Sequence, residues 1–340
     1  MFYEKVEGGA CRCRLCAHGC VIGEGKRGIC AVRENRGGRL YSLVYGKLIA
    51  MNVDPVEKKP LFHFLPGTRT LSIAAAGCNL RCEHCQNYEI SQFPRERPEV
   101  EIPGAMATPE AVLEAAIERG CRSISYTYTE PTIFLEFALD CARLARERQK
   151  DIKNVFVSNG FMTGDSAAAA ADLLDANNID LKGGERFYRD VCHARAAPVK
   201  ETIRLMREKG VWVEVTTLVI PGLNDSAEDL LDIARFIVSV DPFMPWHVSR
   251  FHPGYKLLDR PATPPAAVKK AREIGLEAGL KHVYTGNVVF LGGDGEDTFC
   301  PYCGAKVISR DGYFIKSMRL DEKGACPFCS HRLAGVWNSK

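Results

Sequence analysis

Short apolar runs rich in β-branched residues alternate with amphipathic stretches through the middle of the chain. Runs of this length between polar segments are typical of buried strands. They predict strands at 71–76, 123–128, 154–158, 178–181, 211–220, 246–249 and 282–285. Patterns with helical spacing separate them and predict helices at about 131–148, 166–176, 198–209, 227–239 and 264–278. One more helix is predicted to begin at Thr108-Pro109, and Ser226 with Asp229 resembles a capping box.

Strand and helix alternate at a spacing that predicts an α/β fold, with parallel strands joined by right-handed crossovers. About six such units could form a partial or complete β/α barrel, or an open doubly wound sheet. In each arrangement the functional residues are expected at the carboxyl ends of the strands.

Composition changes this expectation little. The 340 residues are 46% hydrophobic and 26% charged, with a formal net charge of +3, as in an ordinary soluble protein. A nucleic-acid-binding protein would carry a clear and clustered basic excess. The acidic start at 1–9 does not resemble a signal peptide, and no apolar run approaches the roughly 20 residues that cross a bilayer. We therefore expect a cytoplasmic protein without membrane contact.

The 15 cysteines are the strongest chemical signal. In a reducing cytoplasm, metal ligation is the main use for so many thiols. Twelve of the 15 fall into three groups: Cys11, Cys13, Cys16, Cys20 and Cys30; Cys78, Cys82 and Cys85; and Cys300, Cys303, Cys326 and Cys329. The isolated Cys121, Cys141 and Cys192 are expected to be small buried apolar residues.

The central group places three thiols directly after the first predicted strand, at Cys78, Cys82 and Cys85. Three thiolates in one loop can bind three irons of a [4Fe–4S] cluster and leave the fourth iron open to a ligand. The alternative is a structural zinc site, which requires four protein ligands. Only His84 stands at a suitable spacing for the fourth, so a catalytic cluster is favoured.

The outer groups offer four thiols each. The pairs Cys300/Cys303 and Cys326/Cys329 are typical of a zinc ribbon or rubredoxin-like unit, and tetrahedral zinc is favoured over iron. Near the start, Cys13, Cys16, Cys20 and Cys30 could bind zinc or a second iron–sulfur cluster, with Cys11 spare. Spacing does not decide between them, and a stabilising metal site is slightly favoured.

The C-x3-C-x2-C spacing, with His84 before the third cysteine, resembles the radical S-adenosylmethionine (SAM) superfamily. The resemblance implies that the open iron chelates SAM and that a reduced cluster cleaves it to a 5′-deoxyadenosyl radical. It also implies that Glu130 binds the SAM ammonium, in the place of a Gly-Gly-Glu motif whose glycines are here Tyr128 and Thr129. Further motifs at successive strand ends assign cofactor contacts to Ser158, Asn159, Asp180, Lys182, Asn224 and His252. Taken alone, Asp180 and Lys182 could instead be a surface ion pair, and Asn159-Gly160 a turn.

Residues 13–33, 54–67 and the C-terminal cysteine pairs extend the likeness to nearly the whole chain. They resemble the radical SAM enzymes of the AmmeMemoRadiSam system, relatives of pyruvate formate-lyase activating enzyme. This resemblance implies a (β/α)6-type partial TIM barrel at 66–295. A cysteine-rich extension is expected at 1–65, and a zinc-ribbon-like unit at 296–340.

The implied activity is that of an oxidoreductase that abstracts hydrogen from a protein or from a substrate presented by a protein. SAM and an electron donor such as flavodoxin or ferredoxin are the expected partners. A second hypothesis is a radical SAM enzyme that modifies RNA gripped by the C-terminal unit, although the weak basic excess argues against it. A third is a non-enzymatic iron–sulfur redox sensor, for which the ordered SAM contacts would be superfluous.

Overall fold

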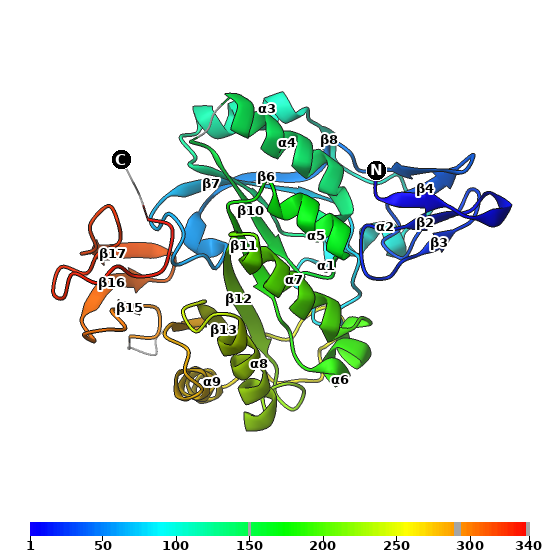
Figure 1. The fold of residues 1–340 in the computed structure, drawn as a ribbon. Coiled ribbons are helices and arrows are strands. Elements are labelled where there is room, and N and C mark those ends of the chain that lie inside the picture. Colours follow the sequence, from blue (N-terminus) through cyan, green and yellow to red (C-terminus); the bar gives the residue numbers. More distant parts are fainter. Residues whose placement is uncertain (149–150, 289–293, 338–340) are drawn as a thin grey trace.

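A nine-stranded sheet forms the centre of the protein (Figure 1). The computed structural model describes residues 1–148, 151–288 and 294–337. From one edge to the other, the strands are β14 (Val283–Gly286), β13 (Trp246–Arg250), β12 (Trp212–Val219), β11 (Ala176–Asp180), β10 (Lys153–Ser158), β9 (Ser123–Tyr126), β7 (Arg69–Ala75), β6 (Lys47–Pro55) and β8 (Ala105–Met106).

The seven strands from β7 to β14 are parallel and lie in the order in which they occur in the chain. A doubly wound sheet would reverse this order at a switch point. Consecutive right-handed crossovers without reversal place the helices on one face, as in a barrel. Edge strands β14 and β8 do not pair with each other in the described residues, so the sheet stays open. This order favours the partial β/α barrel among the predicted alternatives.

All seven predicted strands are present, but two antiparallel strands of the main sheet, as well as the short strands of the terminal units, escaped prediction. Strand β6 pairs along its length with β7, and the short β8 pairs with β6. Strand β6 precedes residue 66, so the main sheet includes part of the segment expected to be an N-terminal extension. Its sequence alternates apolar and polar residues only weakly, which left no clear period-2 signal.

The helices also follow the predicted pattern. Thr108 and Ser226 accept hydrogen bonds from the backbone N–H groups of Ala111 and Asp229, which confirms both predicted N-termini. The helix predicted at 166–176 is shorter than expected and ends at Ala171. The main helices are α3 (Pro109–Glu118), α4 (Leu135–Arg148), α5 (Gly164–Ala171), α7 (Ala196–Glu208), α8 (Ala227–Val240) and α9 (Pro265–Glu277). Short helices are α1 (Tyr88–Ser91), α2 (Phe93–Glu96) and α6 (Glu185–Phe187). Within the described ranges, no helix combines the length and apolar character needed to span a membrane.

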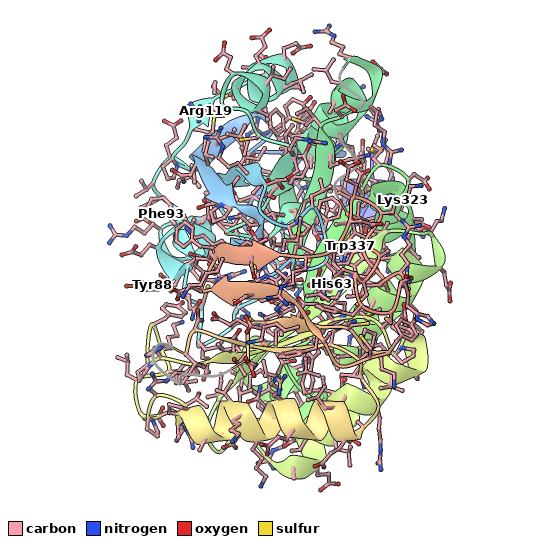
Figure 2. The ribbon with its side chains drawn as sticks, turned by 90° about the vertical axis from the view of Figure 1, so that its left-hand side faces the viewer. His63, Tyr88, Phe93, Arg119, Lys323 and Trp337 are labelled. Carbon is pink, nitrogen blue, oxygen red and sulfur yellow. The ribbon has the colours of Figure 1, made fainter. Side chains whose placement is uncertain are left out.

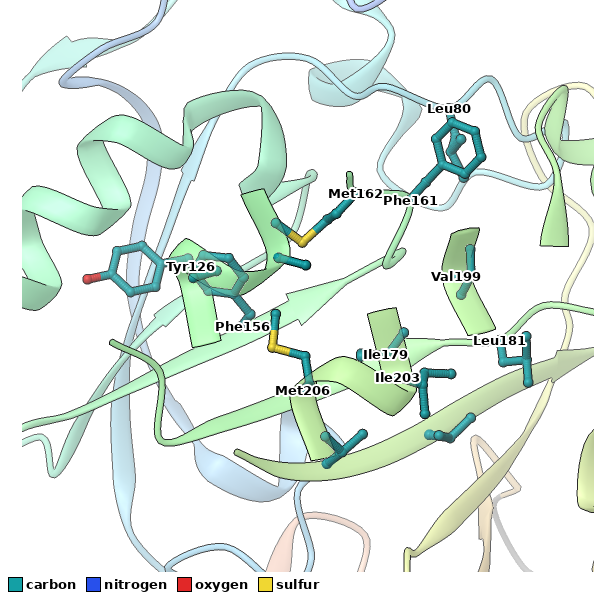
Figure 3. Close-up of a cluster of buried hydrophobic side chains, with 14 of the residues drawn as sticks. Leu80, Tyr126, Phe156, Phe161, Met162, Ile179, Leu181, Val199, Ile203 and Met206 are labelled. Carbon is teal, nitrogen blue, oxygen red and sulfur yellow. The ribbon is translucent and has the colours of Figure 1, made fainter. Parts of the chain in front are cut away.

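The main core lies between the sheet and its helices (Figure 3). Val199, Ile203 and Met206 share one face of α7 because their spacing follows the helical period. They belong to the same buried cluster as Phe156 of β10 and Ile179 of β11. This packing fixes the strand ends from which the polar side chains of the site project.

An N-terminal unit covers the carboxyl edge of the parallel strands. It contains β1 (Tyr3–Lys5), β2 (Cys11–Cys13), β3 (Val21–Ile22), β4 (Arg33–Arg36) and β5 (Arg39–Ser42). The loop after β10 anchors it, because the hydroxyls of Thr163 and Ser166 donate to the carbonyls of Arg14 and Leu15, each at 2.7 Å. The N-terminal cysteines are therefore held at the same end of the sheet as the loop that follows β7.

A C-terminal unit packs at the opposite, amino-terminal edge of the strands (Figures 1 and 2). It contains β15 (Thr298–Phe299), β16 (Lys306–Asp311) and β17 (Phe314–Met318). The backbone of Val336 accepts from Leu65 N and donates to His63 O, each at 2.7 Å. The rings of His63 and Trp337 lie 5.3 Å apart. The last described residues thus close onto the segment between β6 and β7.

Glu214 is the centre of a hydrogen-bond network at this amino-terminal edge of the strands. Its carboxylate is fully buried and accepts hydrogen bonds from Phe62 N at 3.0 Å and His63 N at 2.8 Å. It also accepts from Trp212 Nε1 at 2.9 Å and contacts His247 Nε2 at 2.7 Å. A buried carboxylate persists only where such donors replace water, so this residue joins β12, β13 and the segment after β6.

We expect Glu214→Ala to lower the free energy of unfolding by about 3–5 kcal/mol, because it leaves four buried donors without an acceptor. Equilibrium denaturation in urea measures the loss. Glu201→Ala, at an exposed position in the middle of α7, is the control and should change stability by less than about 0.5 kcal/mol. Equal unfolding midpoints for the two variants would contradict the role given to Glu214.

Candidate functional site

The loop with Cys78, Cys82 and Cys85 follows β7 at the carboxyl edge of the sheet. Its backbone is tied to the chain around residue 191, since Arg81 N donates to Cys192 O at 3.3 Å and Glu83 N donates to Val191 O at 3.1 Å. Gly77 has a φ of 113°, and a Cβ there would lie 2.9 Å from a methyl group of Val32. A glycine is therefore required where the loop meets the N-terminal unit.

Each sulfur of the loop has its own polar neighbour. Cys78 Sγ accepts from Leu80 N at 3.4 Å, and Cys85 Sγ lies 3.1 Å from Ser91 Oγ. Burial and then the Glu130 carboxylate raise the pKa of Cys78. A hydrogen bond to Cys192 and burial raise the pKa of Cys82. Such thiols ionise when a metal supplies positive charge, which fits iron ligation.

The spacing of the three sulfurs distinguishes a cluster from a single ion. In the described residues, Cys78, Cys82 and Cys85 do not form a group whose ligand atoms all lie within 4.8 Å of one another, whereas Cys82 does so with His84 and Cys192. Ligands of one ion must converge, whereas three thiolates that bind three different irons stay farther apart. The donor set of Cys78, Cys82 and Cys85 therefore fits a [4Fe–4S] cluster better than the zinc alternative.

Cys192 is a neighbour of the site that sequence analysis missed. It is fully buried at the end of a π-turn spanning Tyr188–Cys192. His84 is also buried, packs against Phe187 with ring centroids 5.7 Å apart, and has an Nδ1 without a partner. Burial, and then the Lys182 cation, lower the pKa of His84 to about 3. No motif connects Cys192 to the loop, so only the fold could reveal this contact.

Glu130 forms the polar centre of the site at the end of β9. Its side chain is 1% exposed. One carboxylate oxygen accepts from Thr132 N at 3.0 Å, Thr132 Oγ1 at 2.6 Å and Ser158 Oγ at 2.8 Å, and the other accepts from Asn159 N at 2.7 Å. Burial raises the pKa of Glu130 although these hydrogen bonds oppose the shift. The carboxylate thus links the ends of two neighbouring strands.

Asn159 carries this connection to the cysteine loop. Its Nδ2 donates to Asn79 Oδ1 at 2.8 Å and lies 3.7 Å from Cys78 Sγ. The following Gly160 has a φ of 67°, and a Cβ there would lie 2.8 Å from Ile179. Ser158-Asn159-Gly160 is therefore a tight turn. It directs the side-chain amide of Asn159 at Cys78 Sγ.

Asp180 and Lys182 form an ion pair of 2.6 Å at the end of β11. The Lys182 side chain is only 14% exposed, so the pair is not an ordinary surface salt bridge. Burial opposes ionisation, but Asp180 and then Cys82 raise the pKa of Lys182. Asn224 fixes this strand end, because its Nδ2 donates to Lys182 O at 2.6 Å. The ammonium group is thereby held beside the cysteine loop.

His252 lies on an exposed loop after β13. This loop reaches the cysteine loop through Lys256 N and Leu257 N, which donate to Glu83 O at 3.0 and 3.1 Å. The structure therefore places its backbone beside the site, while the imidazole of His252 faces solvent. The other predicted residues, from Glu130 to Asn224, lie in buried or half-buried positions at successive strand ends.

Tyr128, two residues before Glu130, has a backbone conformation that glycine favours. It has a φ of 61°, a left-handed conformation that costs a tyrosine about 1–3 kcal/mol. Its hydroxyl donates to Asp54, and Lys59 Nζ lies 4.5 Å from its ring centroid. Burial lowers the pKa of Lys59 to about 8. The side chain of Tyr128 is thus held by the buried ion pair of Asp54 and Lys59, in which Oδ2 and Nζ lie 2.7 Å apart.

The two outer cysteine groups differ in geometry. In the C-terminal unit, Cys300 Sγ and Cys329 Sγ lie 3.6 Å apart, and Cys303 Sγ and Cys326 Sγ lie 3.8 Å apart. Sulfurs about 2.3 Å from a zinc ion form a tetrahedron with edges of about 3.8 Å, so these thiols fit zinc. The N-terminal Cys13, Cys16, Cys20 and Cys30 instead line a cavity next to the barrel.

Comparison with known proteins is consistent with this geometry. The family described as the radical SAM superfamily matches residues 72–237, from β7 into α8. The chain belongs to the radical SAM superfamily. Membership implies a [4Fe–4S] cluster and SAM as cofactors, and the loop after β7 is the part of this radical SAM protein that fits the cluster. The C-terminal group is a plausible additional metal site.

Two relatives illustrate how similar this radical SAM protein is to known sequences. Uncharacterized protein MJ0808 of Methanocaldococcus jannaschii is 47% identical over 335 residues, which are 98% of each chain. Pyruvate formate-lyase-activating enzyme of Clostridium pasteurianum is 22% identical over 232 residues, which cover 64% of this chain and 92% of that enzyme.

Solved structures show the same fold. SuiB of Streptococcus suis bound to S-adenosylmethionine has a TM-score of 0.52 at 14% identity, covering 73% of this chain and 58% of SuiB. A radical SAM methyltransferase from Sphaerobacter thermophilus has a TM-score of 0.51 at 14% identity, covering 67% and 69% of the two chains.

We expect Cys303→Ser to lower the zinc content by about one ion per chain, because a tetrahedral site seldom survives the loss of one thiolate. Iron content should not change, since the unit lies at the opposite edge of the sheet. Metal analysis of the anaerobically purified protein measures both. Cys121→Ala, which removes a buried thiol outside all three groups, is the control. Wild-type zinc in Cys303→Ser would exclude this site.

Proposed function

We propose that this radical SAM protein cleaves SAM reductively and abstracts hydrogen from a protein or from a substrate presented by a protein. The observation that carries the proposal is the continuous link from Glu130 through Asn159 to Cys78. Hydrogen bonds join a buried carboxylate to the loop that fits the cluster. A structural metal site would not require such a polar arrangement at several strand ends.

Each group of residues has a distinct part in the proposal. Cys78, Cys82 and Cys85 hold three irons, and Glu130 receives the SAM ammonium on the carboxylate oxygen that now has a single donor. Lys182 lies near the SAM carboxylate as a charge-assisted donor. Ser158, Asn159, Asp180, Asn224 and His252 shape the remainder of the cofactor site. When bound, the reduced cluster supplies the electron that splits SAM into methionine and a 5′-deoxyadenosyl radical.

The choice of a protein substrate rests on kinship. The relative from Clostridium pasteurianum is named for activating an enzyme, and its match covers 64% of this chain. The likeness of residues 13–33 and 54–67 to the AmmeMemoRadiSam radical SAM enzymes points the same way. A flavodoxin- or ferredoxin-type carrier is the proposed electron donor. The near-neutral charge of +3 gives no support to RNA as the substrate.

We expect anaerobically reconstituted protein to convert SAM to 5′-deoxyadenosine and methionine when a strong reductant is present. Cys82→Ala should abolish the formation of 5′-deoxyadenosine. The two remaining thiolates cannot hold a [4Fe–4S] cluster in which only one iron is open. Chromatography of the nucleoside product measures the rate. Cys141→Ala removes a fully buried thiol away from the loop and is the control. Full SAM cleavage by Cys82→Ala would overturn the central assignment.

We expect Glu130→Gln to weaken SAM binding about ten- to a hundredfold, since a charge-assisted contact in a partly dry site contributes about 1.5–3 kcal/mol. Lys182→Met should have a similar effect. Equilibrium binding of SAM under anaerobic conditions measures both, with iron content determined in parallel.

Thr132→Val is the matched control for Glu130→Gln. It removes one internal hydrogen bond to the carboxylate but keeps the negative charge. If Glu130 contacts SAM, this variant loses stability while its SAM affinity changes less than about threefold. If Glu130 only orders the turn after β10, both variants lose stability and neither loses affinity selectively. That second pattern would remove Glu130 from the SAM site.

A further inference from the structure

Four thiols of the N-terminal unit face a single cavity. Its lining includes Cys13, Cys16, Cys20 and Cys30, and it encloses about 320 Å³ of space including its open mouth. Cys11 lies on the same strand as Cys13 but does not line this cavity. The fold therefore selects four of the five N-terminal cysteines and leaves Cys11 out.

The spacing of these thiols does not fit a single zinc ion. In the part of the chain that the structure describes, the C-terminal thiols converge within 4.8 Å of one another, but no three N-terminal thiols do. Both groups have four cysteines, so the number of ligands does not explain the difference. Four thiolates that surround a cube of iron and sulfide bind four separate irons and stand farther apart than the ligands of one ion.

The surroundings of the cavity suit a charged cluster. Leu15 and Ile22 provide an apolar wall that keeps out water, and both side chains are 2% exposed. Arg33 lines the same cavity, is 4% exposed and donates to Glu136 Oε1 at 2.7 Å. This guanidinium is paired with Glu136 and also interacts electrostatically with Cys13 and Cys30. Low solvent exposure and a fixed cation are properties by which proteins tune iron–sulfur clusters.

The cavity adjoins the loop of the central cluster. Asn79, the residue after Cys78, lines it, and its carbonyl accepts from His18 Nε2 at 2.9 Å. Arg95 clamps the two cysteine groups together, because its Nη2 donates to Ile29 O at 2.9 Å and to Cys78 O at 3.0 Å. The two sets of thiols are thus neighbours within one packed unit.

We propose that Cys13, Cys16, Cys20 and Cys30 bind a second [4Fe–4S] cluster, with one thiolate on each iron. All four irons have a protein ligand, so this cluster has no open position for SAM. The site is distinct from the SAM-cleaving centre, and the proposal goes beyond the proposed function. It replaces the stabilising zinc that the spacing of the cysteines alone slightly favoured.

The decisive experiment removes the central cluster and keeps the full chain. The variant Cys78→Ala/Cys82→Ala/Cys85→Ala is reconstituted anaerobically with iron and sulfide, and iron, sulfide and zinc are counted per chain. We expect about four irons, about four sulfides and one zinc, with a Mössbauer spectrum typical of a [4Fe–4S] cluster. About two zincs without sulfide, or one iron without sulfide, would overturn the proposal.

A second pair of variants tests the site in protein that keeps its central loop. The wild-type chain should hold about eight irons and eight sulfides. Cys20→Ala should lose about half of each, whereas Cys11→Ala, its matched control outside the cavity, should lose none. Equal iron and sulfide in Cys20→Ala and the wild type would also overturn the proposal, independently of any measurement of SAM cleavage.

Discussion

The burial of the Glu130 carboxylate is the constraint on which the site depends. A carboxylate without access to water must be surrounded by donors, and here they come from the turn before α4 and from the end of β10. Satisfying this one group fixes the turn at Ser158-Asn159-Gly160. This turn directs Asn159 at Cys78, so the solvation of one acid helps to position the cysteine loop, together with the backbone bonds of the loop to Val191 and Cys192.

The two terminal units serve opposite edges of the sheet. The N-terminal unit covers the carboxyl edge, where Gly77 and Arg95 bring its cysteines against the central loop. The C-terminal unit seals the amino edge around Glu214. The carboxyl edge therefore carries the cysteines of the N-terminal unit and of the central loop, while the amino edge carries buried hydrogen bonds and the compact four-thiol site. The strands of the barrel separate these sets of cysteines.

Much of this organisation was predictable from local patterns. The parallel strands, the helix caps at Thr108 and Ser226 and the three groups of cysteines have signals within a few residues of sequence. Contacts between distant segments had none. The approach of Cys192 to Cys82, the left-handed backbone of Tyr128 and the pairing of β6 depend on tertiary packing, which overrides local preference. Spacing along the chain also left open whether zinc or an iron–sulfur cluster binds at the N-terminal cysteines, because it does not define the spacing between sulfur atoms.

The contact between His63 and Val336 has a consequence for biosynthesis. Segment 61–65 is made early, yet Val336, the partner of His63 O and Leu65 N, is among the last residues that the structure describes. Until those residues are synthesised, Phe62 and His63 are not fully shielded from solvent. Contacts of such long sequence separation also form slowly. The amino edge of the barrel therefore cannot be completed before these last described residues have been made.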